Sequence, residues 1–272
     1  MALSEFQRGV CRLIAGGRIA SGESYVAGGA ALNELLQAAR RSHDIDLFHD
    51  TAEAVLASWE ADQALLLREG FEVRPTRIFT AFVEASVERG GEAVVLQWVQ
   101  DSAFRFFPLL EHPDFGLTLH PFDLATNKTL ALIGRAEVRD WVDIISCHTA
   151  LQAFGLLVWA ACGKDPSLGP DFILEQARRS ARYAKPDLER LAFDGEAPNP
   201  QRLGNIWRRM LAEAEEISAL LPENHVGQCV LDCEAGLFKG SLSALRQAVA
   251  NNTLRFHEGR IRGAWPSVVN QN

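Results

Sequence analysis

Two aspartates one residue apart, Asp44 and Asp46, are the side chains of this chain best suited to chemistry. If Ile45, Leu47 and their neighbours form a strand, alternate side chains share a face, and the two carboxylates lie on one side about 6 to 7 Å apart. Mg²⁺ takes one or two protein carboxylates and completes its octahedron with water and substrate phosphates. The pair therefore predicts a magnesium site that serves a nucleoside triphosphate. The alternative is a solvated strand end.

A Gly-Gly turn ahead of the aspartates predicts a place for phosphate. A short strand precedes Gly28 and Gly29, and a helix is expected over 30–40, which is rich in Ala, Leu, Glu and Gln. Glycine lets a phosphate approach the backbone, and the first N–H groups of a helix favour an anion. Arg40 or Arg41, together with the Ser42 hydroxyl, could hold phosphate oxygens. An ordinary turn is the alternative.

Two later segments carry further candidates. Lys128 stands in Leu124–Arg135, and Asp140 and Asp143 stand in Arg139–Ile144. Taken with the Gly-Gly turn and the aspartate segment, these four stretches resemble, in order and rough spacing, the motifs of the AbiEii/AbiGii-type nucleotidyltransferases. These are toxins of bacterial toxin–antitoxin and phage-defence systems. The resemblance covers about residues 20 to 150; one motif alone is weak, but four in order are fairly specific.

The resemblance implies a role for each matched position. Asp44 and Asp46 would bind Mg²⁺, while Ser42 and the Gly-Gly turn would contact the triphosphate. Lys128 would bind a phosphate, and Asp143, or Asp140, would complete the site.

The chemistry of nucleotidyl transfer suits these side chains. The α-phosphate is attacked in line while pyrophosphate leaves, so metal ions and a lysine are needed to neutralise charge on the phosphate oxygens. The remaining carboxylate could orient the attacking hydroxyl or accept its proton. On a helix, Asp140 and Asp143 stand three residues apart and face the same way. The alternatives are a solvated lysine at Lys128 and an ion pair of Asp140 with Arg139 or Arg135.

Two positions depart from the family pattern. Ala30 stands where the family usually has Thr, so one hydroxyl is missing. Gln97 stands where members of the wider superfamily carry a third carboxylate, on the strand 92–101. Glutamine binds Mg²⁺ only through a neutral oxygen. Either one metal suffices, Asp101 substitutes, or activity has decayed.

Composition limits the partners. The formal net charge of −8 argues against nonspecific attraction to nucleic acid, but it allows a local basic groove for tRNA. Two basic stretches could form one, with solvated helix faces as the alternative: Arg178, Arg179, Arg182 and Lys185, and Trp207-Arg-Arg209.

Cysteine usage and hydropathy predict a cytoplasmic protein with no membrane partner. The five cysteines form no Cys-x-x-Cys pair, and no amino-terminal signal sequence is recognised. Cys229 and Cys233 are expected to be buried thiols. The longest apolar run, over 153–163, is far shorter than the roughly 20 residues that span a membrane.

The predicted fold is α/β (α+β), a nucleotidyltransferase-like mixed sheet with flanking helices followed by a helical lobe. A catalytic domain is expected over 1–150 and a helical domain over 151–272. Periodicity and turn signals give the elements. In the first domain we expect helices over 1–20 and 51–69, strands over 71–73, 78–87, 93–99 and 116–120, and a Gly-Gly hairpin at 88–91. The second is expected to be helical throughout.

The predicted function is transfer of a nucleoside monophosphate from a nucleoside triphosphate to RNA such as tRNA, or to protein. A toxin role would bring an antitoxin protein as partner. One alternative is a catalytically reduced nucleotide-binding or interaction protein of the same fold, suggested by Gln97 and Ala30. Another is a nucleotidyltransferase that acts on small molecules.

Overall fold

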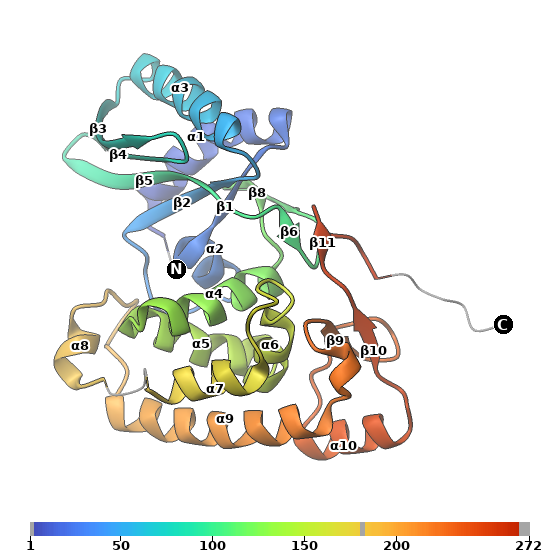
Figure 1. The fold of residues 1–272 in the computed structure, drawn as a ribbon. Helices are drawn as coiled ribbons and strands as arrows, with labels where there is room; N and C mark the ends of the chain where they lie inside the picture. Colours follow the sequence, from blue (N-terminus) through green and yellow to red (C-terminus); the bar gives the residue numbers. More distant parts are fainter. Residues whose placement is uncertain (1–2, 180–182, 267–272) are drawn as a thin grey trace. The chain divides into compact units, whose positions relative to one another are not determined.

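The structure is a computed structural model that describes residues 3–179 and 183–266. The chain forms two compact units (Figure 1). Unit 1 comprises 1–103, 108–120 and 193–195, and unit 2 comprises 104–107, 121–192 and 196–272. The functional division of the chain at residue 150 stays a prediction.

A mixed seven-stranded sheet forms the centre of unit 1, with the strand order β3-β4-β5-β2-β1-β8-β7. β2 runs parallel to β5 and β1 parallel to β8, while the other neighbours are antiparallel. The strands are β1 (Ser24–Ala27), β2 (Asp44–His49), β3 (Glu72–Phe79), β4 (Phe82–Arg89), β5 (Glu92–Gln100), β7 (Leu110–His112) and β8 (Gly116–Thr118).

Helices α1 (Glu5–Ser21) and α3 (Ala52–Arg68) pack together on one face of this sheet (Figure 1). Each begins at a side-chain cap, Ser4 for α1 and Thr51 for α3, because the hydroxyl accepts a hydrogen bond from a free N–H of the first turn. The ring of Trp59 on α3 meets that of Trp98 on β5 at 4.8 Å between centroids. The sheet face beneath these helices is therefore the apolar one, and the other face carries the polar side chains.

Two expectations for unit 1 need correction. The helix that follows β1, α2 (Gly28–Leu35), ends five residues earlier than expected. Gln37 takes a positive φ of 51°, and the Ala38 N–H donates to the Asn33 carbonyl, which closes the helix end. The strand expected over 78–87 is instead the end of β3, a turn at 80–81 and β4. The Gly-Gly hairpin is confirmed, with positive φ at both glycines.

Two titratable side chains are buried beneath the helices of unit 1. His49 ends β2 fully buried, and burial lowers its pKa to about 4. Asp62 of α3 accepts a hydrogen bond from Trp98 Nε1 at 2.9 Å. Burial raises the pKa of Asp62 to about 6, against the opposing charge of Arg18. The folded protein therefore holds His49 neutral and takes up a proton at Asp62 in mild acid.

Replacing Asp62 should steepen the loss of stability in acid. Between about pH 4 and 6.5, His49 gains a proton only in the unfolded chain, so its contribution to stability falls as the pH falls. Asp62 gains a proton first in the folded protein, so its contribution rises as the pH falls, and the two terms of about 3 kcal/mol each largely cancel. Urea unfolding at several pH values measures the free energy of unfolding. As the pH falls, this free energy should decrease more steeply in Asp62→Asn than in the parent, and it should change in the opposite direction in His49→Asn. Identical slopes in all three proteins would contradict these pKa directions.

Unit 2 is mainly helical. Its helices are α4 (Pro121–Arg135), α5 (Val138–Ala150), α6 (Phe154–Ala161), α7 (Pro170–Arg179), α8 (Lys185–Glu189), α9 (Pro200–Leu220) and α10 (Leu242–Ala250), with a 3₁₀ turn at Glu223–His225. Apolar side chains of α6, α9 and α10 pack into one core with those of a short strand, β9 (Cys229–Leu231). Within the described ranges, no single helix is long and apolar enough to cross a membrane. α5 and α6 pass that test of length and composition only as a pair, which is bent by 112°.

The expectation of an entirely helical second half is wrong. β9 pairs with β10 (Arg255–His257), and β11 (Arg260–Ile261) pairs with β6 (Phe104–Arg105). Strands of two or three residues are too short to show a period of two in the sequence. Cys229 is buried as expected, but Cys233 is exposed.

Candidate functional site

Asp44 and Asp46 lie on the polar face of β2, the face opposite α3. Burial alternates along this strand: both aspartates are half-buried, whereas Ile45 and Leu47 are fully buried. Asp46 stands between two strands, opposite Ala27 of β1 and Gln97 of β5. Both carboxylates therefore lie on one face of β2, as predicted.

The two glycines predicted to form a turn are instead the first residues of α2, and Gly28 lies directly against Asp46. Gly28 begins α2 with a φ of +64°, and a Cβ atom there would lie 1.7 Å from Asp46 Oδ2. A Cβ atom at Gly29 would lie 2.5 Å from Arg40 Nη2. Ala27, the N-cap of α2, makes no side-chain cap hydrogen bond. Backbone, carboxylate and guanidinium can meet here because neither glycine has a side chain.

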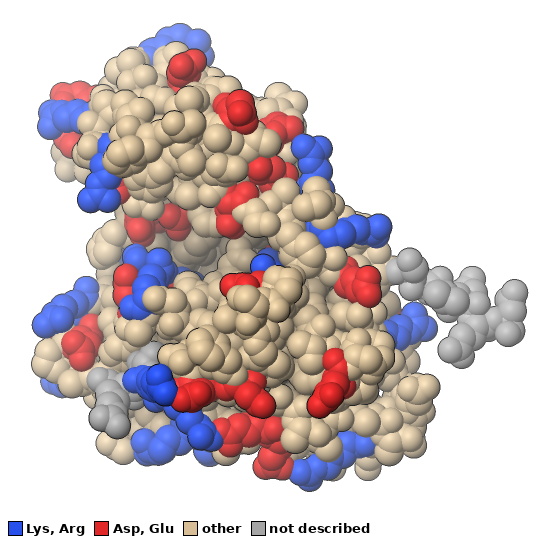
Figure 2. Space-filling model, viewed as in Figure 1, with Lys and Arg blue, Asp and Glu red and all other residues tan. Residues whose placement is uncertain are grey.

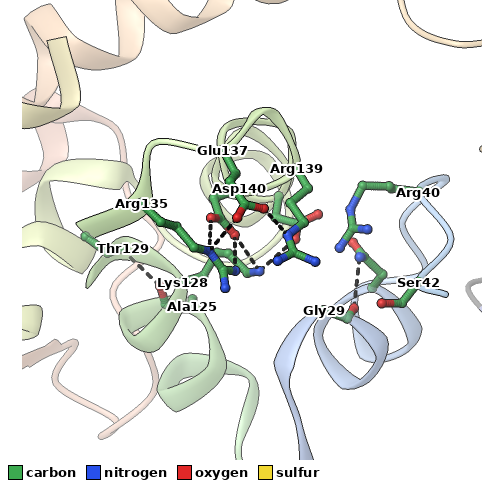
Figure 3. Close-up of polar contacts among 12 residues, drawn as sticks. Gly29, Arg40, Ser42, Ala125, Lys128, Thr129, Arg135, Glu137, Arg139 and Asp140 are labelled. Carbon is green, nitrogen blue, oxygen red and sulfur yellow. Dashed lines mark hydrogen bonds and ion pairs between the residues drawn. The ribbon is translucent and has the colours of Figure 1, made fainter. Parts of the chain in front are cut away.

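The loop between α2 and β2 brings polar side chains to the same place. Ser42 Oγ donates to Asp44 Oδ1 at 3.1 Å. Arg40 is buried with its guanidinium against Gly29 (Figure 3). Arg41 instead pairs with the exposed Asp194, at 2.9 Å between Nη2 and Oδ1. Of the two arginines considered for phosphate, Arg40 is the one at the turn.

The residues present fit a Mg²⁺ ion that a substrate helps to hold. Among residues 3–179 and 183–266, no three His, Cys, Asp or Glu side chains gather closely enough to hold a metal by themselves. Mg²⁺ needs no such cage, because it commonly takes one or two carboxylates and completes its coordination with phosphates and water. The space over Gly28, which a Cβ atom would fill, is occupied by the carboxylate of Asp46. We therefore take Asp44 and Asp46 as the candidate ligands.

Alanine at Gly28 should damage this site far more than alanine at a glycine of matched conformation. Gly90 has the same φ of +64°, but a Cβ atom there would have nothing within 4 Å. Both substitutions should cost about 1 to 2 kcal/mol of stability, because alanine is strained at positive φ. Only Gly28→Ala should displace Asp46 and weaken Mn²⁺ binding, by about 10- to 100-fold. A Mn²⁺ titration followed by electron paramagnetic resonance measures this, and parent-like affinity in Gly28→Ala would contradict the arrangement.

Unit 2 carries a second group of candidates, which we name the lysine cluster: Lys128 and Arg135 of α4 with Asp140 and Asp143 of α5. Figure 3 labels Lys128, Arg135 and Asp140. Lys128 Nζ lies 2.9 Å from Asp140 Oδ1 and 3.1 Å from Asp143 Oδ2. Arg135 binds Asp140 through two nitrogens, at 2.7 and 2.9 Å. Lys128 is thus a buried, paired lysine and not a solvated one.

The structure also decides between the partners expected for Asp140. Asp140 pairs with Arg135 in addition to Lys128, while Arg139 Nε lies 2.6 Å from Glu137 Oε2. Burial alone would raise the pKa of Asp140, but the hydrogen bonds from Arg135 and the charge of Lys128 outweigh it and hold the pKa below its usual value. Asp140 is therefore held ionised by two cations.

Two arginines of the first basic stretch of unit 2 are paired with acids, while Arg208 of the second donates to Asn205. Arg178 pairs with Glu215 and Arg179 with Glu175. Lys185 Nζ lies 3.4 Å from Glu189 Oε1, and Arg182 lies outside the described residues. Figure 2 shows blue and red side chains interspersed over the helical part of the molecule. Of the two aromatic side chains in or beside these stretches, Trp207 is buried, and the Tyr183 hydroxyl donates to the Ala136 carbonyl.

Comparison by sequence finds no relative: no protein-family model and no curated protein matches this chain. Comparison by structure does. A protein of H. pylori described as a candidate nucleotidyltransferase matches with a TM-score of 0.51 and 13% identity, over 81% of this chain and 100% of that one. JHP933 from Helicobacter pylori matches with a TM-score of 0.51 and 14% identity, over 80% of this chain and 97% of that one. MenT4, nucleotidyltransferase toxin Rv2826c from Mycobacterium tuberculosis H37Rv, has a TM-score of 0.48 and 16% identity, over 92% of this chain and 96% of that one.

The two Helicobacter structures confirm the predicted fold class. At this level of identity they show a shared architecture: a mixed sheet with flanking helices and further helices beyond it. The fold is therefore nucleotidyltransferase-like. Membership of the AbiEii/AbiGii-type family stays a prediction based on the four motifs.

Proposed function

We propose that this protein is a Mg²⁺-dependent nucleotidyltransferase that moves a nucleoside monophosphate from a nucleoside triphosphate to an acceptor. The observation that carries the proposal is the carboxylate pair on β2, with Asp46 packed over Gly28 where no side chain would fit. A pair of carboxylates beside a bare helix start is suited to a metal–triphosphate complex. A fold shared with a described candidate nucleotidyltransferase adds support.

In this proposal the polar face of unit 1 holds the triphosphate. Asp44 and Asp46 bind Mg²⁺, which would neutralise charge on the phosphate oxygens. The N–H groups that begin α2 donate to a phosphate across the Gly-Gly turn, and Ser42 keeps Asp44 oriented through its hydrogen bond. Arg40 lies against Gly29 and supplies positive charge there. Arg41 stays a second candidate for phosphate, on condition that it leaves Asp194.

The lysine cluster contributes the remaining charge and the proton acceptor. Lys128 binds a phosphate oxygen, and Asp143 accepts the proton of the attacking hydroxyl. Asp140 holds Lys128 and Arg135 in place, as its bonds to both cations indicate. The two carboxylates thereby take different roles although both lie next to Lys128.

The acceptor we propose is RNA such as tRNA, or a protein, and the biological role is that of a cytoplasmic toxin with an antitoxin partner. These finer assignments, with a link to phage defence, rest on the motif resemblance. Because two arginines of α7 are paired with acids, we do not expect that helix to bind RNA over a broad surface. We therefore favour an acceptor that the enzyme holds only near its reacting end.

Purified protein incubated with Mg²⁺ and each α-labelled triphosphate, together with total RNA, total protein or neither, should label one macromolecular pool. Label on RNA would support an RNA-directed enzyme and label on protein a protein-modifying one.

A catalytically reduced nucleotide-binding protein is the second candidate, favoured by a neutral Gln97 directly beside Asp46. Saturable triphosphate binding without transfer to any pool would identify it.

A further inference from the structure

A row of polar side chains crosses three strands of unit 1. Asp46 of β2 stands opposite Gln97 of β5, and Gln97 stands opposite Glu84 of β4. All three are half-buried on the polar face of the sheet. Glu84 is therefore the carboxylate that lies on the far side of Gln97 from Asp46, and nothing in the sequence motifs singles it out.

Glu84 is fixed by neighbours on both of its oxygens. Thr76 Oγ1 donates to Glu84 Oε1 at 2.8 Å, and Arg77 Nε lies 3.8 Å from the same oxygen. Gln97 Nε2 donates to Glu84 Oε2 at 2.8 Å. This carboxylate therefore has a defined position from which it can orient the amide.

The bond to Glu84 decides which end of the Gln97 amide faces which strand. An ionised carboxylate only accepts hydrogen bonds, so the amide nitrogen must face Glu84; the opposite amide orientation would bring two acceptors together. β4 and β2 flank β5 on opposite sides, so an amide that bonds Glu84 through its nitrogen can present Oε1 on the side of β2, where Asp46 lies. Within the described residues, Oε1 accepts no hydrogen bond from protein.

We propose that Glu84 is a positioning residue that orients Gln97, so that Gln97 Oε1 adds a neutral oxygen ligand to the divalent-cation site of Asp44 and Asp46. This inference rests on the proposed function, because it assumes that the carboxylate pair binds a metal. Amide oxygens are acceptable ligands for hard cations. Glutamine at this position then serves the site without adding a third negative charge.

The test is a Mn²⁺ titration of the full-length protein, with free Mn²⁺ followed by electron paramagnetic resonance. Gln97→Ala and Glu84→Gln should each weaken Mn²⁺ binding by about 10-fold or more, since residues that orient a ligand are commonly worth 10- to 100-fold. Adding Glu84→Gln to Gln97→Ala should cause no further loss, because Glu84 acts through Gln97. The exchange Glu84→Gln with Gln97→Glu should restore binding to the parent level or above: the new amide can donate to the new carboxylate, which keeps an oxygen on the Asp46 side.

A matched control and a metal-free readout separate this role from a structural one. Glu88→Gln changes a carboxylate on the same strand face, four residues away, and should leave Mn²⁺ affinity at the parent level. Without metal, the side-chain amide protons of Gln97 should exchange slowly in an NMR spectrum of the parent and faster in Glu84→Gln.

Two results would overturn the inference. The first is a Glu84→Gln loss of the same size in the Gln97→Ala protein, because Glu84 would then act independently of Gln97. The second is parent-like affinity in both single variants while Asp46→Asn loses Mn²⁺, which would remove Gln97 from the site and leave the proposed function intact. If Asp46→Asn also retains Mn²⁺ binding, the proposed function itself fails.

Discussion

Asp46→Asn should abolish Mg²⁺-dependent triphosphate binding and lower transfer by about 100- to 1,000-fold, the usual effect of removing one group that stabilises transition-state charge. Asparagine keeps the size of the side chain over Gly28 but removes the charge that the metal needs. The fold should change little, because Asp46 is half-buried on a polar sheet face. Calorimetric titration with ATP, GTP, CTP and UTP, each with and without Mg²⁺, measures the binding.

Asp50→Asn is the control for this substitution. Asp50 follows β2 with its carboxylate bonded to the Tyr25 hydroxyl at 3.2 Å, and no role in metal binding is assigned to it. Asp50→Asn should bind triphosphates as the parent does. An Asp46→Asn protein with parent-like Mg²⁺-dependent binding would move the site away from β2.

Asp143→Asn should lower transfer by about 100- to 10,000-fold and leave triphosphate affinity nearly unchanged, if the carboxylate accepts the proton of the acceptor hydroxyl. Its stability should fall by only about 1 kcal/mol, since Lys128 keeps its ion pair with Asp140. Asp140→Asn should instead lose mainly stability and keep most of its transfer activity. It withdraws the carboxylate that bridges Lys128 and Arg135 and leaves Lys128 with Asp143 alone, and removing one partner of a buried ion pair costs about 3 to 5 kcal/mol.

Urea unfolding and single-turnover transfer in the two variants separate these roles. Unaltered transfer in Asp143→Asn would end its assignment as the base. If Asp140→Asn loses transfer completely while its stability stays at the parent level, the two carboxylates have exchanged roles.

The local features that position the site were predictable from the sequence. Alternation over 44–49 predicted β2 and its polar face, and the glycines marked the junction between β1 and α2, although α2 begins at Gly28 and not at residue 30. The two-residue hairpin at Gly90 and Gly91 even fixes the pairing of Glu84 with Gln97, since a tight turn sets the register of both strands. That signal was present in the sequence, but the motifs drew attention only to Gln97.

Features that depend on tertiary contacts could not be predicted. The pairing of Asp46 with Gln97 joins parallel strands about 50 residues apart, and no turn sets their register. The end of α2 at Leu35 runs against the good helix formers that follow, because the chain must turn back toward β2. Arg40 and Arg41 look alike in the sequence, yet one is buried at Gly29 and the other pairs with Asp194, 153 residues away.

The most direct test of nucleotidyl transfer follows the two ends of the triphosphate separately. The parent protein with Mg²⁺ and a macromolecular acceptor pool should move label from the α-phosphate onto the acceptor and release label from the γ-phosphate as pyrophosphate, in equal amounts. Chelation of Mg²⁺ should stop both. Label from the γ-phosphate on the acceptor would show phosphoryl transfer instead, and absence of α-label from every acceptor pool with all four triphosphates would contradict the enzyme assignment.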